Sequence, residues 1–196
     1  MTGPTALLVI DPQRVYTDPR SELHCADADE TISRINRLVN LATRKGWSII
    51  TVRHVHKADG SDLGRMFDYA GDESGEFNFR EDSDEVAYDN RLVVPSSATE
   101  IVKTRYSAFA GTALNEILDR QNISRVVVVG FMTNFCCEST AREAHDRDYY
   151  VDFIPDATGT PGTENIGEEK MRSFVAECLA AGIARVFSTD EFLQLS

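Results

Sequence analysis

Residues 124–157, SRVVVVGFMTNFCCESTAREAHDRDYYVDFIPDA, decide the fold. The apolar run at 124–130 predicts a strand that is buried on both faces. The stretch that contains the paired cysteines predicts a helix, and 150–157 predicts a second strand. Strands that alternate with helices, several of them apolar on both faces, indicate a mostly parallel sheet with helices on both sides.

The same alternation continues in both directions from this stretch. Helices are predicted near 28–45, 111–121 and 163–181, the last with Met171, Phe174, Val175 and Cys178 on its apolar stripe. The other predicted strands are ALLVID (6–11), WSIITVRHV (47–55), EIVKT (100–104) and ARVFST (184–189). The pattern therefore predicts the α/β class, with three layers and a mostly parallel sheet.

Length and charge limit the possible organisation and partners. A chain of 196 residues, 42% of them hydrophobic, is predicted to form one domain over residues 1–196. Its 20 basic and 32 acidic side chains give a net charge of -12, which opposes binding to nucleic acid or to an anionic membrane. A small-molecule substrate is the expected partner.

Neither the amino terminus nor the cysteines suggest export. The stretch MTGPTALLVIDPQR has no basic region and only a short apolar run, and no later stretch is long enough to span a bilayer. The 4 cysteines are unevenly spaced and form no Cys-x-x-Cys motif, so neither a disulfide scaffold nor a zinc knuckle is expected. We therefore expect a cytoplasmic protein with reduced thiols.

Residues 57–90 interrupt the alternation of strands and helices. They are rich in Asp, Glu, Gly and Ser, and they contain the aromatic residues Phe67, Tyr69, Phe77, Phe79 and Tyr88. This composition predicts a long surface insertion or lid with aromatic anchors rather than a linker.

The two adjacent cysteines differ in their predicted surroundings. A thiol in the first turn of a helix is expected to have a lowered pKa, because the helix amino terminus favours the thiolate. Helical spacing places Cys137 on one stripe with Ala141 and Ala144, which predicts packing against the sheet. Cys136 falls on another face and is predicted to be the exposed thiol. From this stretch alone, two small core residues are an equally good interpretation.

Two charged residues also lie at carboxyl ends of predicted strands, where the ligand cleft of an open parallel sheet is found. Asp11 ends the first strand, and Lys103 lies at the end of the strand before Tyr106. Each has a simpler interpretation, since Asp11 before Pro12 could cap a turn and Lys103 could be a solvated lysine. A carboxylate, an ammonium group and a thiol converging on one edge, however, suit nucleophilic catalysis.

These blocks resemble the isochorismatase-like cysteine hydrolases, a family that includes nicotinamidases and N-carbamoylsarcosine, biuret and ureidoacrylate amidohydrolases. The resemblance extends over nearly the whole chain. It rests on ALLVIDPQRVYTD, VKTRYSAFAGTAL, the Gly-x-x-Thr-Asn-x-Cys stretch that ends at Cys136, and PDATGT. It implies an isochorismatase-like hydrolase fold with a Rossmann-like sheet, and a homo-oligomer, either a dimer or a tetramer.

The resemblance also implies a mechanism. Cys136 would be the nucleophile, Asp11 the proton acceptor and donor, and Lys103 the positive partner that orients the site. A cis peptide between Phe131 and Met132 would direct the backbone N–H groups of Met132 and Cys136 into an oxyanion hole. The expected reaction is hydrolysis of a C–N bond in a small amide, ureido or carbamoyl substrate through a thioester.

The region after the second strand departs from the nicotinamidase pattern. There His54 and His56 alternate to one face, but Val52 supplies no carboxylate, so neither a metal nor another cofactor is expected. We interpret His54 as a side chain at the cleft edge. The residues predicted to bind substrate are Gln13, Tyr16, His54, Phe67 and Phe109, each close to a catalytic block or in the insertion.

Three alternatives remain open at this stage. Relatives named for isochorismate cleave a vinyl ether and lack the cysteine, so Cys136 argues against that reaction. A catalytically idle scaffold would have no need of Asp11 and Lys103. A thiol sensor would need a resolving cysteine, and an adjacent one such as Cys137 is poorly placed for that role.

Overall fold

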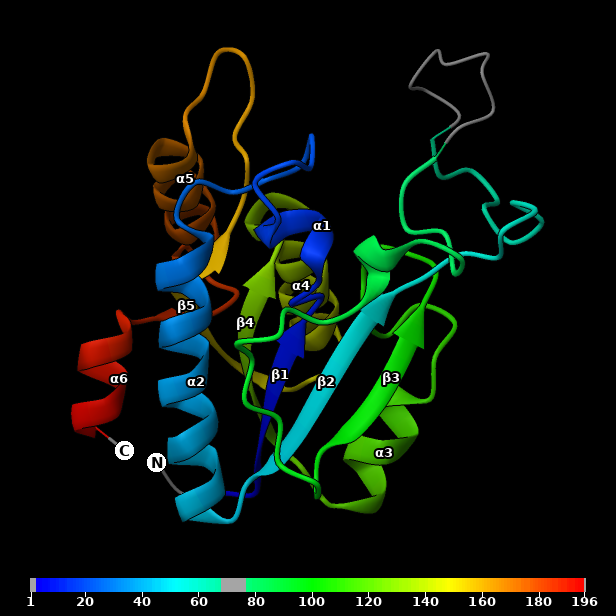
Figure 1. The fold of residues 1–196 in the computed structure, drawn as a ribbon. Coiled ribbons are helices and arrows are strands. Elements are labelled where there is room, and N and C mark those ends of the chain that lie inside the picture. Colours follow the sequence, from blue (N-terminus) through cyan, green and yellow to red (C-terminus); the bar gives the residue numbers. More distant parts are fainter. Residues whose placement is uncertain (1–2, 68–76, 196) are drawn as a thin grey trace.

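A six-stranded, fully parallel sheet forms the centre of the computed structural model (Figure 1). The strand order is β3-β2-β1-β4-β5-β6. The central strands β1 and β4 are buried along nearly their whole length, as their continuous apolar sequences predict. The strands are β1 (Thr5–Ile10), β2 (Ser48–His54), β3 (Thr99–Lys103), β4 (Arg125–Phe131), β5 (Tyr150–Gly159) and β6 (Arg185–Val186).

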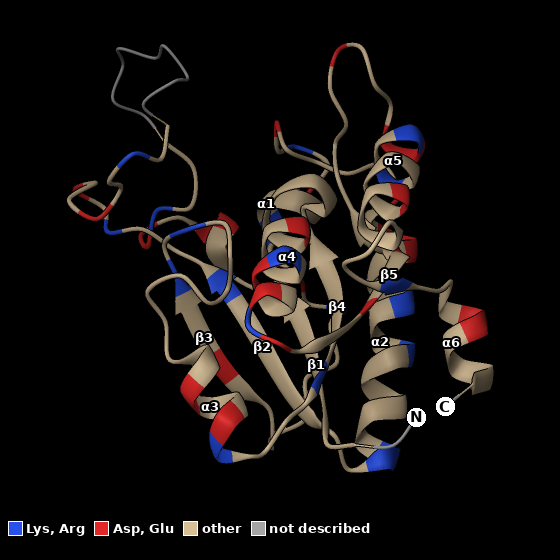
Figure 2. Ribbon diagram, turned by 180° about the vertical axis from the view of Figure 1, so that it is seen from behind, with Lys and Arg blue, Asp and Glu red and all other residues tan. Residues whose placement is uncertain are grey.

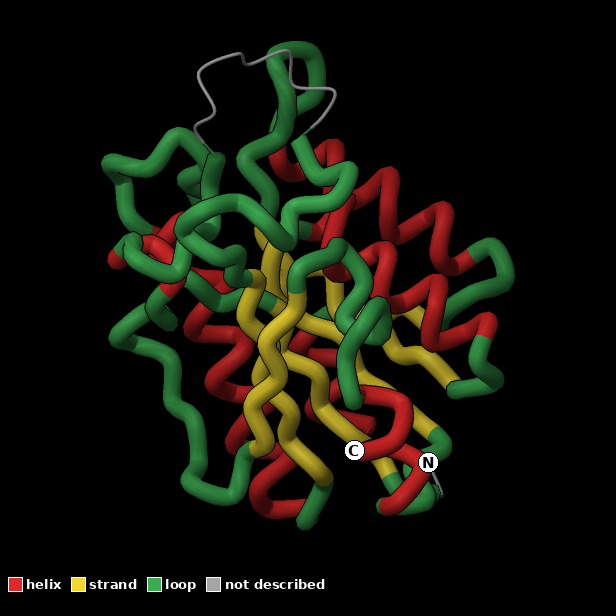
Figure 3. Tube along the Cα trace, turned by 90° about the vertical axis from the view of Figure 1, so that its right-hand side faces the viewer, coloured by secondary structure: helices red, strands yellow, loops and turns green. Residues whose placement is uncertain are grey.

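Helices cover both faces of the sheet, so the molecule has three layers (Figures 2 and 3). One face packs against α3 (Leu114–Arg120), α4 (Glu138–Asp146) and α5 (Glu168–Ala180). The other packs against α1 (Arg14–Thr17), α2 (Ala28–Lys45) and α6 (Thr189–Leu195). Side chains that alternate along β1 and β4 enter the two cores in turn. The predicted three-layer α/β fold is confirmed.

Several boundaries differ from the sequence-based predictions. The helix expected over 163–181 begins at Glu168, and its buried face runs through Met171, Val175 and Leu179. Phe174, which was assigned to that stripe, is 63% exposed because it falls on the outer side of the helix. The strand expected over 184–189 is only two residues long, because the chain turns at Thr189 into a helix that the sequence pattern did not predict.

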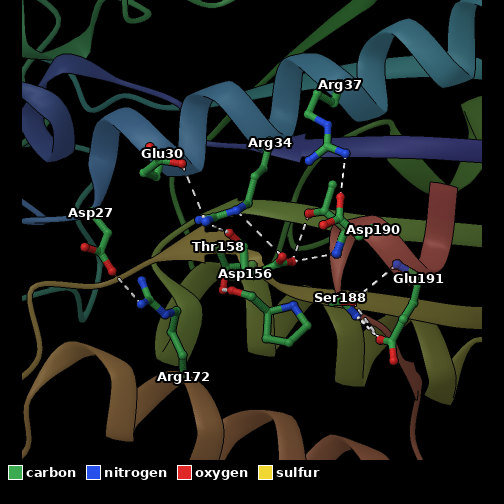
Figure 4. Close-up of polar contacts among 12 residues, drawn as sticks. Asp27, Glu30, Arg34, Arg37, Asp156, Thr158, Arg172, Ser188, Asp190 and Glu191 are labelled. Carbon is green, nitrogen blue, oxygen red and sulfur yellow. Dashed lines mark hydrogen bonds and ion pairs between the residues drawn. The ribbon is translucent and has the colours of Figure 1, made fainter.

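Ion pairs hold this last helix against the rest of the molecule (Figure 4). Asp156, in β5, accepts hydrogen bonds from the backbone N–H and the hydroxyl of Thr189, each at 2.9 Å. Arg34 of α2 faces the same carboxylate, and Arg37 pairs with Asp190. Because these contacts satisfy the start of α6, they fix a helix too short to be stable alone.

The structure describes residues 3–67 and 77–195. Within these ranges, the insertion predicted at 57–90 consists of loops and one short 3-10 turn, η1 (Asp84–Val86), on the side of the molecule where the strands end. Tyr69 and the centre of the predicted lid lie outside the described residues. None of the helices within the described ranges has the length and apolar character that a membrane crossing requires.

Candidate active site

Three residues from the ends of three strands meet in the interior. The Lys103 ammonium lies 2.8 Å from the Asp11 carboxylate and 3.2 Å from Cys136 Sγ, and it donates to the backbone oxygen of Arg105 at 3.0 Å. All three side chains are at most 1% exposed. The structure thus excludes the solvated-lysine and turn-cap interpretations of Lys103 and Asp11.

The backbone at the ends of β1 and β4 is unusual on both sides of this cluster. Asp11 has a φ of 45°, a conformation that is costly for a residue with a side chain, and its N–H donates to the Val52 oxygen at 3.0 Å. Gly130 has a φ of 121°, and a Cβ there would collide with the backbone oxygen of Ile10. A side chain at position 130 would therefore separate the two strands that carry Asp11 and Cys136.

Both cysteines lie in a five-residue π-helical turn, η2 (Thr133–Cys137), which precedes α4. The expectation that Cys136 is an exposed thiol is wrong, since it is 1% exposed and lies at the wall of a cavity. The packing role predicted for Cys137 is confirmed, because it is fully buried in the core with Ala141 and Ala144. The cis peptide expected between Phe131 and Met132 is present.

Burial, rather than the helix terminus, dominates the electrostatics of the site. It raises the pKa of Cys136 to about 12, against the opposing effect of the Lys103 charge. The expected lowering of the thiol pKa is therefore wrong. Burial also raises the pKa of Asp11, and Lys103 opposes this shift. For Lys103, burial acts to lower the pKa, but the charges of Asp11 and Cys136 raise it above its usual value.

Raising the pH above 9 is expected to lower the free energy of unfolding. The pKa of Cys136 rises from an ordinary value of 9.0 to about 12 in the folded protein. Between these values the unfolded chain has released the thiol proton while the folded chain retains it. Stability then falls by about 1.4 kcal/mol per pH unit for each such thiol. Burial raises the pKa of Cys137 as well, which acts in the same direction.

Urea unfolding at pH 8, 9.5 and 11 would measure this dependence. The Cys136→Ala variant is the matched control, and its stability should fall less steeply over the same interval. Stability that is constant or rises up to pH 11 would contradict the expectation.

A cavity of about 180 Å³ opens onto the thiol. Its walls are mostly apolar and aromatic, and three of the five residues predicted to bind substrate, Tyr16, His54 and Phe67, are among them. The complete lining is Tyr16, Leu23, His54, Met66, Phe67, Asn78, Phe79, Tyr106, Met132, Phe135 and Cys136.

The structure places the other two predicted substrate-binding residues outside this cavity. Gln13 is buried, and its amide holds the backbone of His54 from both sides, accepting from the N–H at 2.8 Å and donating to the oxygen at 3.0 Å. Phe109 lies in the core, where its ring stacks on that of Tyr149 with the ring centroids 6.0 Å apart. Proximity in sequence to Lys103 therefore did not bring Phe109 to the cavity.

Sequence reasoning missed several residues of the cavity wall. Tyr106 and Phe135 lie next to the catalytic blocks, and that proximity could have identified them. Leu23, Met66, Asn78 and Phe79 come from loops whose paths the periodicity of the sequence does not encode.

The donor set beside the thiol does not suit a metal ion. Asp11, His54 and Cys136 each offer one ligand atom, and these atoms lie within 4.8 Å of one another. Two of the three donors, however, already face the Lys103 ammonium, at 2.8 and 3.2 Å. A divalent cation would lie against that positive charge, so this set does not fit a metal.

Known proteins are similar to this chain in both sequence and fold. The family model for the isochorismatase domain matches residues 5–190. Nicotinamidase 3 of Arabidopsis thaliana is 31% identical over 187 residues, covering 95% of this chain and 85% of the relative. The ureidoacrylate amidohydrolase RutB of Caulobacter segnis is 28% identical, with 82% of this chain and 74% of the relative covered.

A solved structure extends this agreement to three dimensions. The crystal structure of a cysteine hydrolase from Pseudomonas syringae pv. phaseolicola superimposes with a TM-score of 0.89 and 26% identity, over 97% of this chain and 91% of that one. The resemblance inferred from the sequence motifs is thereby confirmed. The chain belongs to the isochorismatase family of hydrolases.

Proposed function

We propose that the protein is a cysteine-dependent amidohydrolase that cleaves a C–N bond of a small amide, ureido or carbamoyl substrate. The observation that carries this proposal is the position of Cys136, a cavity-lining thiol 3.2 Å from an ammonium group that is itself 2.8 Å from a carboxylate. A nucleophile, a proton acceptor and a fixed positive charge are the groups that acyl transfer requires. Relatives named as a nicotinamidase and as a ureidoacrylate amidohydrolase support the bond type.

In the proposed mechanism Asp11 takes the thiol proton as Cys136 Sγ attacks the carbonyl carbon. Asp11 suits this role because one of its carboxylate oxygens lies within 4.8 Å of the thiol sulfur, and because burial raises the pKa of Asp11. The negative charge that forms on the carbonyl oxygen would be stabilised by the backbone N–H groups of Met132 and Cys136. Lys103 stays protonated and compensates the charge of the carboxylate or the thiolate, whichever is ionised.

Collapse of the tetrahedral intermediate breaks the C–N bond, and Asp11 returns its proton to the departing nitrogen. The product amine or ammonia leaves, and the acyl group remains on Cys136 as a thioester. Water then gives a proton to Asp11 and attacks the thioester carbon. Release of the acid, with return of that proton to the sulfur, restores the enzyme.

The size and lining of the cavity limit the substrate. A volume of about 180 Å³ admits a small molecule, and the aromatic walls favour a flat or apolar body attached to the reacting carbonyl.

We also propose that the protein acts in the cytoplasm as a homo-oligomer. The three catalytic groups of each site come from one chain.

Ammonia release over a panel of small primary amides, ureas and carbamoyl amino acids tests this proposal. At least one member should turn over, and mass spectrometry after an acid quench should find the acyl group of that substrate on the peptide that contains Cys136. An isochorismate-type vinyl ether included in the panel tests the alternative reaction. Turnover of that ether alone, or acylation of neither cysteine by any substrate, would overturn the proposal.

A further inference from the structure

A hydrogen-bonded chain of three side chains leads from the surface to the cavity. The Asp62 carboxylate lies 3.2 Å from Nδ1 of His56, and Nε2 of His56 lies 3.0 Å from Nε2 of His54. Asp62 also accepts from the backbone N–H of Lys57, at 3.1 and 3.2 Å to its two oxygens. The proposed mechanism uses none of these three side chains.

The chain of contacts determines which nitrogen carries each proton. An ionised carboxylate only accepts hydrogen bonds, so Nδ1 of His56 must be protonated to donate to Asp62. In a neutral imidazole the other nitrogen is then bare, and Nε2 of His56 therefore accepts from Nε2–H of His54. Nδ1 of His54 is consequently the bare nitrogen of its ring.

That last nitrogen is buried and has no hydrogen-bond partner among the described residues. His54 is 1% exposed and lines the cavity together with Cys136, and one of its ring nitrogens lies within 4.8 Å of the thiol sulfur. Its ring stacks on that of Phe79, with the ring centroids 4.4 Å apart and an interplanar angle of 11°. Gln13 holds the backbone of His54 through two hydrogen bonds. A buried acceptor held rigidly and without a partner costs free energy unless a ligand satisfies it.

We propose that Nδ1 of His54 accepts a hydrogen bond from an N–H group of the substrate. His56 and Asp62 are positioning residues, because their hydrogen bonds keep the His54 proton on Nε2 and leave Nδ1 free to accept. The inference rests on the proposed function and narrows its substrates to those with an N–H beside the scissile carbonyl, as in a primary amide or a ureido group. Burial and the charge of Lys103 lower the pKa of His54, and burial lowers that of His56, so that both rings are neutral at pH 7.

Two matched variants distinguish the role of Nδ1 of His54 from that of Nε2. The amide oxygen of His54→Asn can take the position of Nδ1, whereas the amide of His54→Gln reaches only the position of Nε2 and keeps the contact with His56. Each variant would be assayed on a primary amide that the enzyme hydrolyses and on the methyl ester of the same acid, which has no N–H to donate.

The ratio of kcat/KM for the amide to that for the ester is the decisive quantity. His54→Gln should lower it about tenfold, as loss of one hydrogen bond predicts, while His54→Asn should hold it within about threefold. Ester turnover measures any effect of each substitution on the nucleophile and on the shape of the cavity, and taking the ratio removes that effect from the comparison. If amide and ester turnover fall equally in both variants, His54 is only structural and the proposal is overturned.

Nitrogen-15 NMR of the imidazole groups tests the tautomer without any substrate. His54 should carry its proton on Nε2 in the wild type, and Asp62→Asn should shift part of the population to the other tautomer. A proton on Nδ1 of His54 in the wild type would overturn the proposal even if the enzyme is an amidohydrolase. Failure of the proposed function would appear differently, as acylation of Cys136 by neither the amide nor the ester.

Dialysis against a chelator provides the last control. Turnover should be unchanged. Loss of turnover that zinc restores would assign the bare nitrogen to a metal ion instead, and would overturn the proposal.

Discussion

Replacement of Cys136 with alanine is expected to lower kcat for ammonia release by about 10^4-fold or more, because no other group beside the cavity, within the described residues, is placed to form the thioester. The fold should survive, since the variant loses one small side chain from a turn that is also held by the hydrogen bond between Thr133 and Thr158. The measurement is turnover on whichever amide the panel identifies, together with circular dichroism and thermal unfolding.

Cys137→Ala is the matched control for this variant. The side chain of Cys137 lies in the core, so its loss should cost about 1 kcal/mol of stability and leave kcat within a few-fold of the wild type. The opposite pattern, with turnover kept by Cys136→Ala and lost by Cys137→Ala, would show that the nucleophile has been misassigned.

The second large effect is expected from Lys103→Met, which keeps the length of the side chain and removes its charge. The Asp11 carboxylate would then be buried without a counterion, at a cost of about 3–5 kcal/mol in the free energy of unfolding. Turnover should also be lost, because the positive charge beside the thiol and the carboxylate is gone.

The loss of stability caused by Lys103→Met should depend on pH in a defined direction. Without Lys103 to oppose it, burial raises the pKa of Asp11 further above the value of the unfolded chain. The folded state then binds the carboxyl proton more tightly than the unfolded state does. The stability of the variant relative to the wild type therefore recovers as the pH falls and decreases again as it rises. Urea unfolding at pH 5 and pH 8 measures the difference.

The double variant Asp11→Asn/Lys103→Met separates stability from catalysis. It has no buried charge at this pair, so it should regain about 1–3 kcal/mol relative to the sum of the single changes, and it should remain inactive. If the effects of the two single variants on stability simply add, the two residues are not coupled, and the role assigned to their ion pair is incorrect.

Much of the architecture could be predicted because burial leaves a simple record in the sequence. The continuous apolar runs of β1 and β4 indicated central parallel strands, and polar residues at strand ends indicated the edge that carries the site. The spacing of Cys137, Ala141 and Ala144 on one helical stripe was enough to distinguish a packing cysteine from its neighbour.

The errors have physical causes that local patterns do not contain. Helical spacing reports which face a side chain occupies but not how deeply loops cover that face, so Cys136 was expected to be exposed. For the same reason its pKa was expected to fall, whereas loss of solvation raises it. The pairing of His54 with His56 and Asp62 depends on the path of the loop after β2. The start of α6 depends on Asp156, which lies far earlier in the chain.

The strand order has a consequence for how the site assembles. Strands β1, β2 and β3 are consecutive in the chain and adjacent in the sheet, whereas β4 pairs with the open edge of β1. The charged pair of Asp11 and Lys103 therefore comes entirely from the three strands on one side of the sheet, and the sulfur of Cys136 reaches this pair only when β4 pairs with β1. Pairing of these two central strands is thus the single event that joins the nucleophile to its proton acceptor.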